Sequence, residues 1–240
     1  MNTTILIVFF IVIVVVYTGF MIFMNKKRKS QQAMLANTDF TAAFSDADRY
    51  LHNFIKNEVP YLQKEMDGQQ IEALTYANAS YNNKDAIKDG IKDGLKGLAT
   101  LRTVRFTTLQ TPKYLVLNRG ELHLFDTDTD GDISEHYVFN PTRLQESTIE
   151  EIPLTGNLKA FALQKGEHTK AYKLTLASKS GMMEVVIFSA LVFTFASTAA
   201  SPFSMNAEKW KEEIVIASDF LKKLGEQYPN LKVQIPLMPD

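Results

Sequence analysis

The pattern most suggestive of chemistry is a set of four aspartates at alternate positions in one short segment: Asp126, Asp128, Asp130 and Asp132. Together with Gly131 and the apolar Ile133, they match the first part of a calcium-binding loop, which needs alternating carboxylates, a sharp turn and an apolar anchor. The last loop position should be a bidentate Glu but is Tyr137, so only Glu135 could add a carboxylate, from a different geometry. Asp and Gly are also common in hairpin turns. We therefore expect either weak Ca²⁺ binding by these aspartates or a solvated acidic turn.

Other patterns that would indicate catalysis are missing from the sequence. There is no cysteine, which excludes disulfides, thiolate metal sites and cysteine nucleophiles. There is also no Gly-rich phosphate loop, no Gly-x-Ser-x-Gly and no His-Glu-x-x-His. The histidines, His52, His123, His136 and His168, are not spaced as a metal pair on one helical face, although His123 and His136 could face each other across a hairpin. We expect a non-catalytic protein without a cofactor; the alternative is an enzyme whose site is assembled from scattered residues.

The N-terminal segment predicts a transmembrane anchor. Residues 4–24 are almost all apolar and are followed by a cluster of cations, Lys26, Lys27, Arg28 and Lys29. About 20 apolar residues match the hydrocarbon core of a bilayer, and a cleavable signal peptide would carry its cations before the apolar run. Because Lys and Arg stay on the cytoplasmic side, the sequence predicts a single-pass protein of the cell membrane, with its N-terminus outside and its body cytoplasmic.

Charge separates the cation cluster from the rest of the chain. All 27 Asp and Glu lie beyond residue 29, whereas four of the 26 Lys and Arg lie in the cluster, so the body has a formal net charge of −5. A body of this charge will not bind nucleic acid through its phosphates, and we expect no nucleic-acid partner.

The predicted organisation has five parts. They are a transmembrane anchor (1–25), a basic and polar juxtamembrane linker (26–37), a helical segment (38–99), a β domain with a C-terminal helix (100–228) and a tail (229–240). In the helical segment, Thr38 or Asp39 would cap the first helix and Pro60 would kink or divide it. Residues 69–79 are expected to form a second short helix, and residues 84–98 an amphipathic helix with glycine at each turn.

Alternating apolar residues predict strands from residue 100 onward. The expected strands are 101–106, a hairpin of 114–117 and 121–125 with its turn at 118–120, and then 135–140, 148–152, 160–164, 171–177 and 183–195. Residues 206–227 predict a long helix with Trp210 on its inner face. The apolar residues 185–203 are interpreted as two buried strands, with a second membrane span as the alternative.

About seven short strands closed by a C-terminal helix carrying a tryptophan resemble the pleckstrin-homology (PH) superfold over residues 100–227. The segment from Lys113 to Phe125 is similar to the second hairpin of that family, and the segment from Phe203 to Ile214 is similar to its last strand and helix. The resemblance implies an α+β fold: a PH-like seven-strand barrel or sandwich capped by the C-terminal helix, here behind the anchor and a helical stalk.

The departure from the family concerns its best-known ligand. Lipid-binding members carry several cations on the first hairpin, whereas this chain has only Lys113 near that place, with the four aspartates of 126–132 in the neighbouring loop. These carboxylates would repel a phosphorylated headgroup, so we expect no phosphoinositide binding. The hypothesis is a membrane-anchored scaffolding module that recruits a protein partner; a calcium-responsive sensor using residues 126–132 is the alternative.

Overall fold

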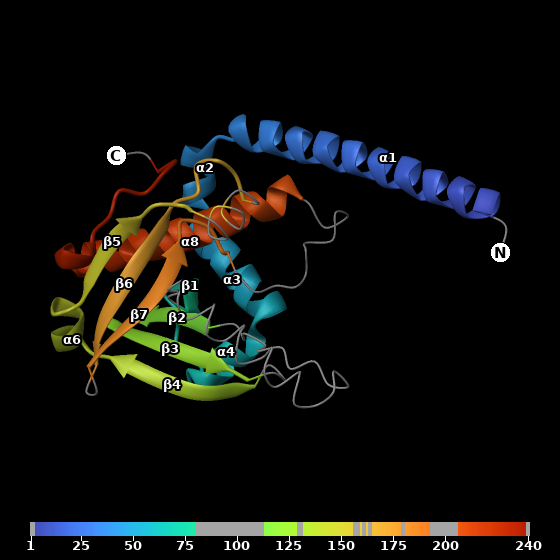
Figure 1. Ribbon diagram of the computed structural model, residues 1–240. Helices are drawn as coiled ribbons and strands as arrows, with labels where there is room; N and C mark the ends of the chain where they lie inside the picture. Colours follow the sequence, from blue (N-terminus) through green and yellow to red (C-terminus); the bar gives the residue numbers. More distant parts are fainter. Residues whose placement is uncertain are drawn as a thin grey trace, which may run out of the picture.

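The computed structural model describes residues 3–79, 113–128, 132–155, 159, 162, 165–178, 181–192 and 206–238. These residues form an α+β fold in which four helices precede and accompany a seven-stranded sheet, and a long C-terminal helix crosses it (Figure 1). The α+β class and the C-terminal helix agree with the prediction, but the predicted fold as a whole is wrong, because it placed a membrane-spanning helix before the sheet and every strand after residue 100.

The first helix corrects the predicted membrane anchor. Helix α1 (Thr3–Ala36) has 34 residues, but no helix in the residues that the structure describes is long and apolar enough to cross a membrane. This finding contradicts the span over residues 4–24, the single-pass membrane protein and the predicted localisation.

Three short helices follow α1, and their boundaries match the sequence signals. Helix α2 (Phe40–Ser45) is capped by Asp39, whose Oδ1 accepts a hydrogen bond of 3.1 Å from the Ala42 N–H. Helix α3 (Ala47–Glu58) ends before Pro60, which opens α4 (Pro60–Glu65) as its first residue. The predicted cap and the predicted interruption at Pro60 are both confirmed.

Residues 73–79 differ from the prediction, because they form strand β1 (Ala73–Ala79) rather than a helix. Leu74 is buried in one hydrophobic cluster, whereas Ala73 and Ala77 are buried in another on the opposite face of the strand. A strand that is buried on both faces lacks the alternation of apolar and polar residues by which a strand is predicted. Its alanines also favour a helix when the segment is considered alone. Tertiary packing overrides that preference, and the sheet therefore begins well before residue 100.

All strand pairs are antiparallel, in the order β4-β3-β2-β1-β7-β6-β5. The strands are β2 (Lys113–Asn118), β3 (Glu121–Thr127), β4 (Ile133–Phe139), β5 (Thr148–Ile152), β6 (Ala171–Ser178) and β7 (Gly181–Phe188), and a short helix α6 (Pro141–Gln145) follows β4. Strand β1 joins the two halves of the sheet, because its first part pairs with β2 and its last residues, Asn78 and Ala79, pair with β7.

The predicted strands agree with the sheet in most places. The hairpin β2–β3 turns at Arg119 and Gly120, which both have positive φ, as a tight hairpin turn requires. Of the predicted strand 160–164 only Ala162 is described, and it is helical. Strand β7 ends at Phe188 rather than continuing toward residue 195. The predictions for 84–98 and 101–106 lie outside the described residues.

Helix α8 (Ala207–Gln227) is the centre of the fold. Its C-terminal half contributes Phe220, Leu221 and Leu224 to the cluster between the two halves of the sheet. Its N-terminal half contributes Trp210 and Ile214 to the second cluster, with α2 and α3. The helix is thus buried between the sheet on one side and α1–α3 on the other (Figure 1). Trp210 is only 7% exposed.

Candidate functional site

The predicted metal residues do not come together as one cluster in the described part of the chain. Asp126 lies on β3 and forms an ion pair with Lys113 on β2. Asp128 and Asp132 meet across the loop, where the Asp132 N–H donates to Asp128 Oδ1 at 3.0 Å. Asp130 lies outside the described residues, within which no group of three or more His, Asp or Glu could hold a metal. Calcium binding by this loop stays a prediction.

The ion pair of Asp126 also bears on the predicted ligand class. Lys113 was the one cation expected near the headgroup position, and its ammonium is paired with a carboxylate of the neighbouring strand. A phosphorylated ligand would have to compete with that carboxylate for the ammonium. The expectation that the chain does not bind phosphoinositides remains untested, and this contact supports it.

Two histidines face each other across β3 and β4. Phe125 and His136 are opposite each other in the register, and His123 Nδ1 lies 2.9 Å from His136 Nε2. The ring of His136 stacks on Phe125, with 4.2 Å between the centroids. Burial lowers the pKa of both histidines, and Glu121 and Glu65 oppose that effect at His123 and His136 respectively. The predicted meeting of His123 and His136 is confirmed.

A tyrosine cluster lies on the same face of the sheet, beneath α3 and α4. The hydroxyl groups of Tyr61 and Tyr114 are 2.8 Å apart, and the ring of Tyr76 lies between Tyr114 and Phe54. Burial raises the pKa of all three tyrosines, so the hydroxyls remain protonated at neutral pH. The cluster therefore acts as core packing with one internal hydrogen bond rather than as a source of nucleophiles or bases.

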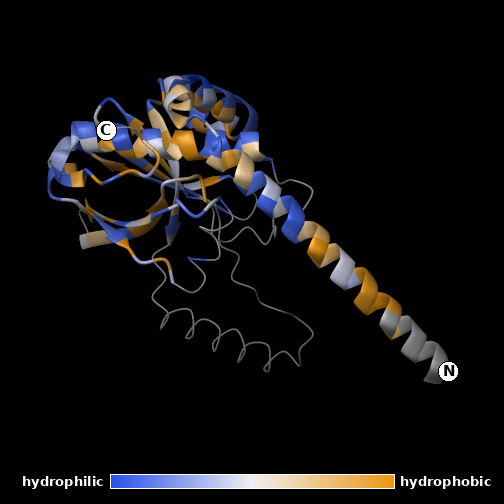
Figure 2. Ribbon diagram, turned by 90° about the horizontal axis from the view of Figure 1, so that it is seen from above, coloured by the Kyte–Doolittle hydropathy of each residue, from blue (hydrophilic) through white to orange (hydrophobic). Residues whose placement is uncertain are grey.

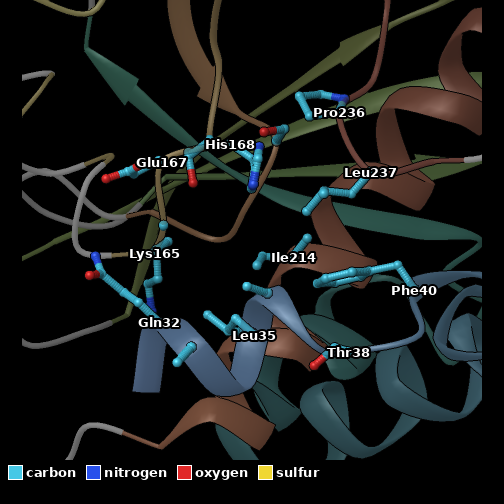
Figure 3. Close-up of a pocket in the computed structure, with 15 residues that line it drawn as sticks. Gln32, Leu35, Thr38, Phe40, Lys165, Glu167, His168, Ile214, Pro236 and Leu237 are labelled. Carbon is cyan, nitrogen blue, oxygen red and sulfur yellow. The ribbon is translucent and has the colours of Figure 1, made fainter. Parts of the chain in front are cut away.

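A pocket of about 410 Å³ opens where α1 meets the body (Figure 3). Its walls come from the C-terminal turns of α1, the start of α2, the loop of residues 165–169, α8 and the C-terminal segment. The apolar lining consists mainly of Leu35, Phe40, Ile214 and Leu237, and the polar lining of Gln32, Thr38, Lys165, His168 and Ser189. A cavity of this size and mixed lining is suited to one small ligand or to one side chain of a partner.

A largely buried ion pair lies at the edge of this pocket. Lys165 forms an ion pair with Glu213 of α8, and their side chains are 18% and 11% exposed. Burial raises the pKa of Glu213, while the Lys165 ammonium lowers it. Because each charge has its partner, this pair fixes the loop of residues 165–169 to α8.

Among the described residues, most of the exposed large apolar side chains lie on α1. Its large apolar side chains between residues 10 and 23 are 42–66% exposed. In Figure 2 this part of α1 projects beyond the body as an apolar helix, whereas the turns nearer the body are polar. Residues 12–17 are all apolar, and six consecutive residues go more than once around a helix. This part of α1 is therefore apolar on every side and has no polar face to turn toward water.

Comparison with protein-family models, with curated proteins and with solved structures finds no match to this chain. The function must therefore be argued from the geometry described above. Sequence reasoning missed the pocket, because its walls come from segments that are distant along the chain.

Proposed function

We propose that the chain is a non-catalytic binding module that recruits a protein partner through α1. The observation that carries the proposal is the exposed apolar surface of α1 between Phe10 and Phe23. A contiguous apolar surface on a folded protein marks a site of association, and a helix that is apolar on all sides is normally buried among other chains or elements.

The chemistry of α1 also defines the partner. The apolar stretch ends beside Lys26 and Lys29, which stand on the same helix. A partner that covers α1 therefore needs an apolar surface, most simply formed by two or more helices, flanked by carboxylates that face these cations. Such a partner would bury the apolar side chains and complement the cations in one contact.

The body supports a binding role in a second way. Seven strands followed by one long helix is the plan of the PH superfold, and we propose that the body is a PH-like module. That superfold carries many protein-binding functions, and the pocket beneath α1 gives the partner a place to insert a side chain.

Site-specific photo-crosslinking of the full chain in its native cells tests the proposal. A photoreactive residue at Val15, which is 64% exposed, should give a discrete adduct with one protein, whereas the same residue at the exposed Met182 of β7 should not. Replacing Lys26 and Lys29 with Glu should reduce the yield of the adduct, because it reverses the charge beside the contact. Replacing Lys222, an exposed cation of α8, with Glu is the matched control and should have no effect.

The outcome that refutes the proposal is equally specific. Adducts of Val15 with lipid alone, or a featureless ladder of many proteins in equal yield, would show that α1 does not recognise a protein partner. A discrete adduct that persists unchanged after the charge reversal would overturn the proposed flanking carboxylates.

A further inference from the structure

We propose that the pocket where α1 meets the body binds an uncharged amphipathic small molecule, with a hydrogen-bond-accepting head at Lys165 and an apolar chain that extends toward Phe40. The pocket has a volume of about 410 Å³. This volume lies at the lower end of the range of about 300–1,000 Å³ that is typical of small-molecule sites. The inference concerns a small ligand and does not depend on the protein partner proposed for α1.

One end of the pocket is apolar. Figure 3 shows Phe40 and Leu237 on one side of the pocket and Lys165 on the other. Leu35 and Ile214 also line the pocket, and both are buried in the hydrophobic cluster to which Phe40 belongs. An apolar chain placed against these side chains would leave water and gain close contacts with them. This end therefore suits an aliphatic chain.

The Lys165 ammonium supplies hydrogen-bond donors at the other end. An ammonium has three N–H donors, and within the part of the chain that the structure describes its only partner is Glu213. Because Lys165 lines the pocket, its remaining donors are available to an acceptor there. The ion pair with Glu213 of α8 also holds the ammonium in place before a ligand arrives, which lowers the entropic cost of binding.

Two buried hydroxyl groups in the lining add to these donors. Thr169 is 4% exposed, and its hydroxyl makes no hydrogen bond to any described residue. Ser189 is 3% exposed, and its Oγ accepts a hydrogen bond of 3.0 Å from the Lys170 N–H. The Ser189 hydroxyl proton has no acceptor among the described residues. Since buried hydroxyls are normally hydrogen-bonded, an acceptor oxygen in the pocket would give both groups the partner that they lack.

The charges around the polar end favour an uncharged head. Lys165 and Glu213 neutralise each other, and both side chains are largely buried. A carboxylate on the ligand would be a second anion close to Glu213, and an ammonium would stand beside that of Lys165, so either head would bring an unpaired charge into the pocket. The other ionisable side chains of the lining, Glu167 and His168, are exposed to solvent. A neutral carbonyl oxygen accepts from the donors without adding a charge.

The test titrates the full chain with octanamide, octanoate and octylamine, which carry the same chain length with neutral, negative and positive heads. The nuclear magnetic resonance signal of the Ile214 methyl groups should shift saturably with octanamide, whereas that of Ile13, which is exposed on α1, should not. Octanoate and octylamine should bind at least about tenfold more weakly, because each buries an unpaired charge. Hexanamide, which has a shorter chain, should also bind about tenfold more weakly than octanamide.

Two variants with matched controls locate the ligand. Ala36→Phe puts a large side chain into the pocket from an exposed position of the lining and should abolish the binding of octanamide, whereas Ala42→Phe, at an exposed position of α2 outside the lining, should not. Thr169→Val removes one donor and should weaken binding about fivefold. Thr41→Val, on the exposed face of α2, should leave binding unchanged. Circular dichroism establishes that each variant is folded.

Four results would overturn the proposal. They are the absence of a saturable shift at Ile214, a shift at Ile13 alone, binding of octanamide that survives in Ala36→Phe, and equal affinity for the three head groups. The first three would show that the pocket is not the binding site, and the last would show that the polar end does not select an uncharged head.

Discussion

Replacing Lys165 with Met should destabilise the protein by about 3–5 kcal/mol at neutral pH, because it leaves the Glu213 carboxylate buried without its partner. The two side chains are 18% and 11% exposed, so solvent screens the pair only slightly. Burial already raises the pKa of Glu213, and the Lys165 ammonium opposes that effect. Removing the ammonium must therefore raise the pKa of Glu213 further.

The loss should depend on pH in a defined direction. A carboxyl group whose pKa is higher in the folded state binds its proton more tightly there than in the unfolded state. Below the unfolded pKa of about 4.3, Glu213 is protonated in both states and the unfolding free energy is not reduced. The reduction grows as the pH rises from there through the folded pKa of Glu213. The difference in unfolding free energy between Lys165→Met and the wild type should be small at pH 4 and largest at pH 8.

Urea unfolding followed by the fluorescence of Trp210 at several pH values measures this difference. The double variant Lys165→Met, Glu213→Gln should recover much of the loss, because it removes the unpaired charge, and its unfolding should lose the extra pH dependence. Lys222→Met on the exposed face of α8 is the matched control and should change little. An equal loss at pH 4 and pH 8 would refute the assignment of a buried, charged Glu213.

Two further substitutions test the core and the β2–β3 turn. Trp210→Ala should lower the unfolding free energy by about 3–5 kcal/mol, because Trp210 is 7% exposed and leaves a large cavity; calorimetry checks this, and a change below 1 kcal/mol would contradict its place in the core. Gly120→Ala should cost about 1 kcal/mol, because Gly120 has φ +76° and an added Cβ meets only an ordinary contact, 3.5 Å from the Tyr228 hydroxyl. Urea unfolding measures it, and a stabilised variant would show that the turn adopts another conformation.

The helices of the body could be predicted closely because their signals are local. Asn206 caps α8 with its side chain, which accepts a hydrogen bond from the Glu208 N–H at 3.0 Å, and the predicted helix differs from α8 by one residue. Asp39 and Pro60 fixed the other boundaries in the same way. The helix predicted over residues 69–79 is wrong. The local sequence favours a helix there, but pairing with β2 and β7 makes residues 73–79 strand β1.

The candidate site shows a similar division. The approach of His123 and His136 followed from two residues of one predicted hairpin, and the register of β3 and β4 confirms it. The alternating aspartates predicted that several carboxylates bind one calcium ion. In the structure, Asp126 instead forms an ion pair with Lys113 on the neighbouring strand. The spacing of residues along the sequence does not show which carboxylate will pair with a cation on the neighbouring strand. The pocket could not be predicted at all, since it needs α1, α8 and the C-terminal segment to meet.

The attachment of α1 to the body explains how an association along α1 would be oriented. Leu35 of α1 is buried in the hydrophobic cluster with α8, and Gln31 Oε1 accepts a hydrogen bond of 2.6 Å from the Ala207 N–H. That N–H belongs to the first turn of α8, where backbone donors lack partners within the helix. The C-terminal part of α1 is therefore fixed to the central helix, while the apolar part projects beyond it (Figure 2). A partner bound along α1 would be held at a defined angle to the sheet, with the pocket at the base of the contact.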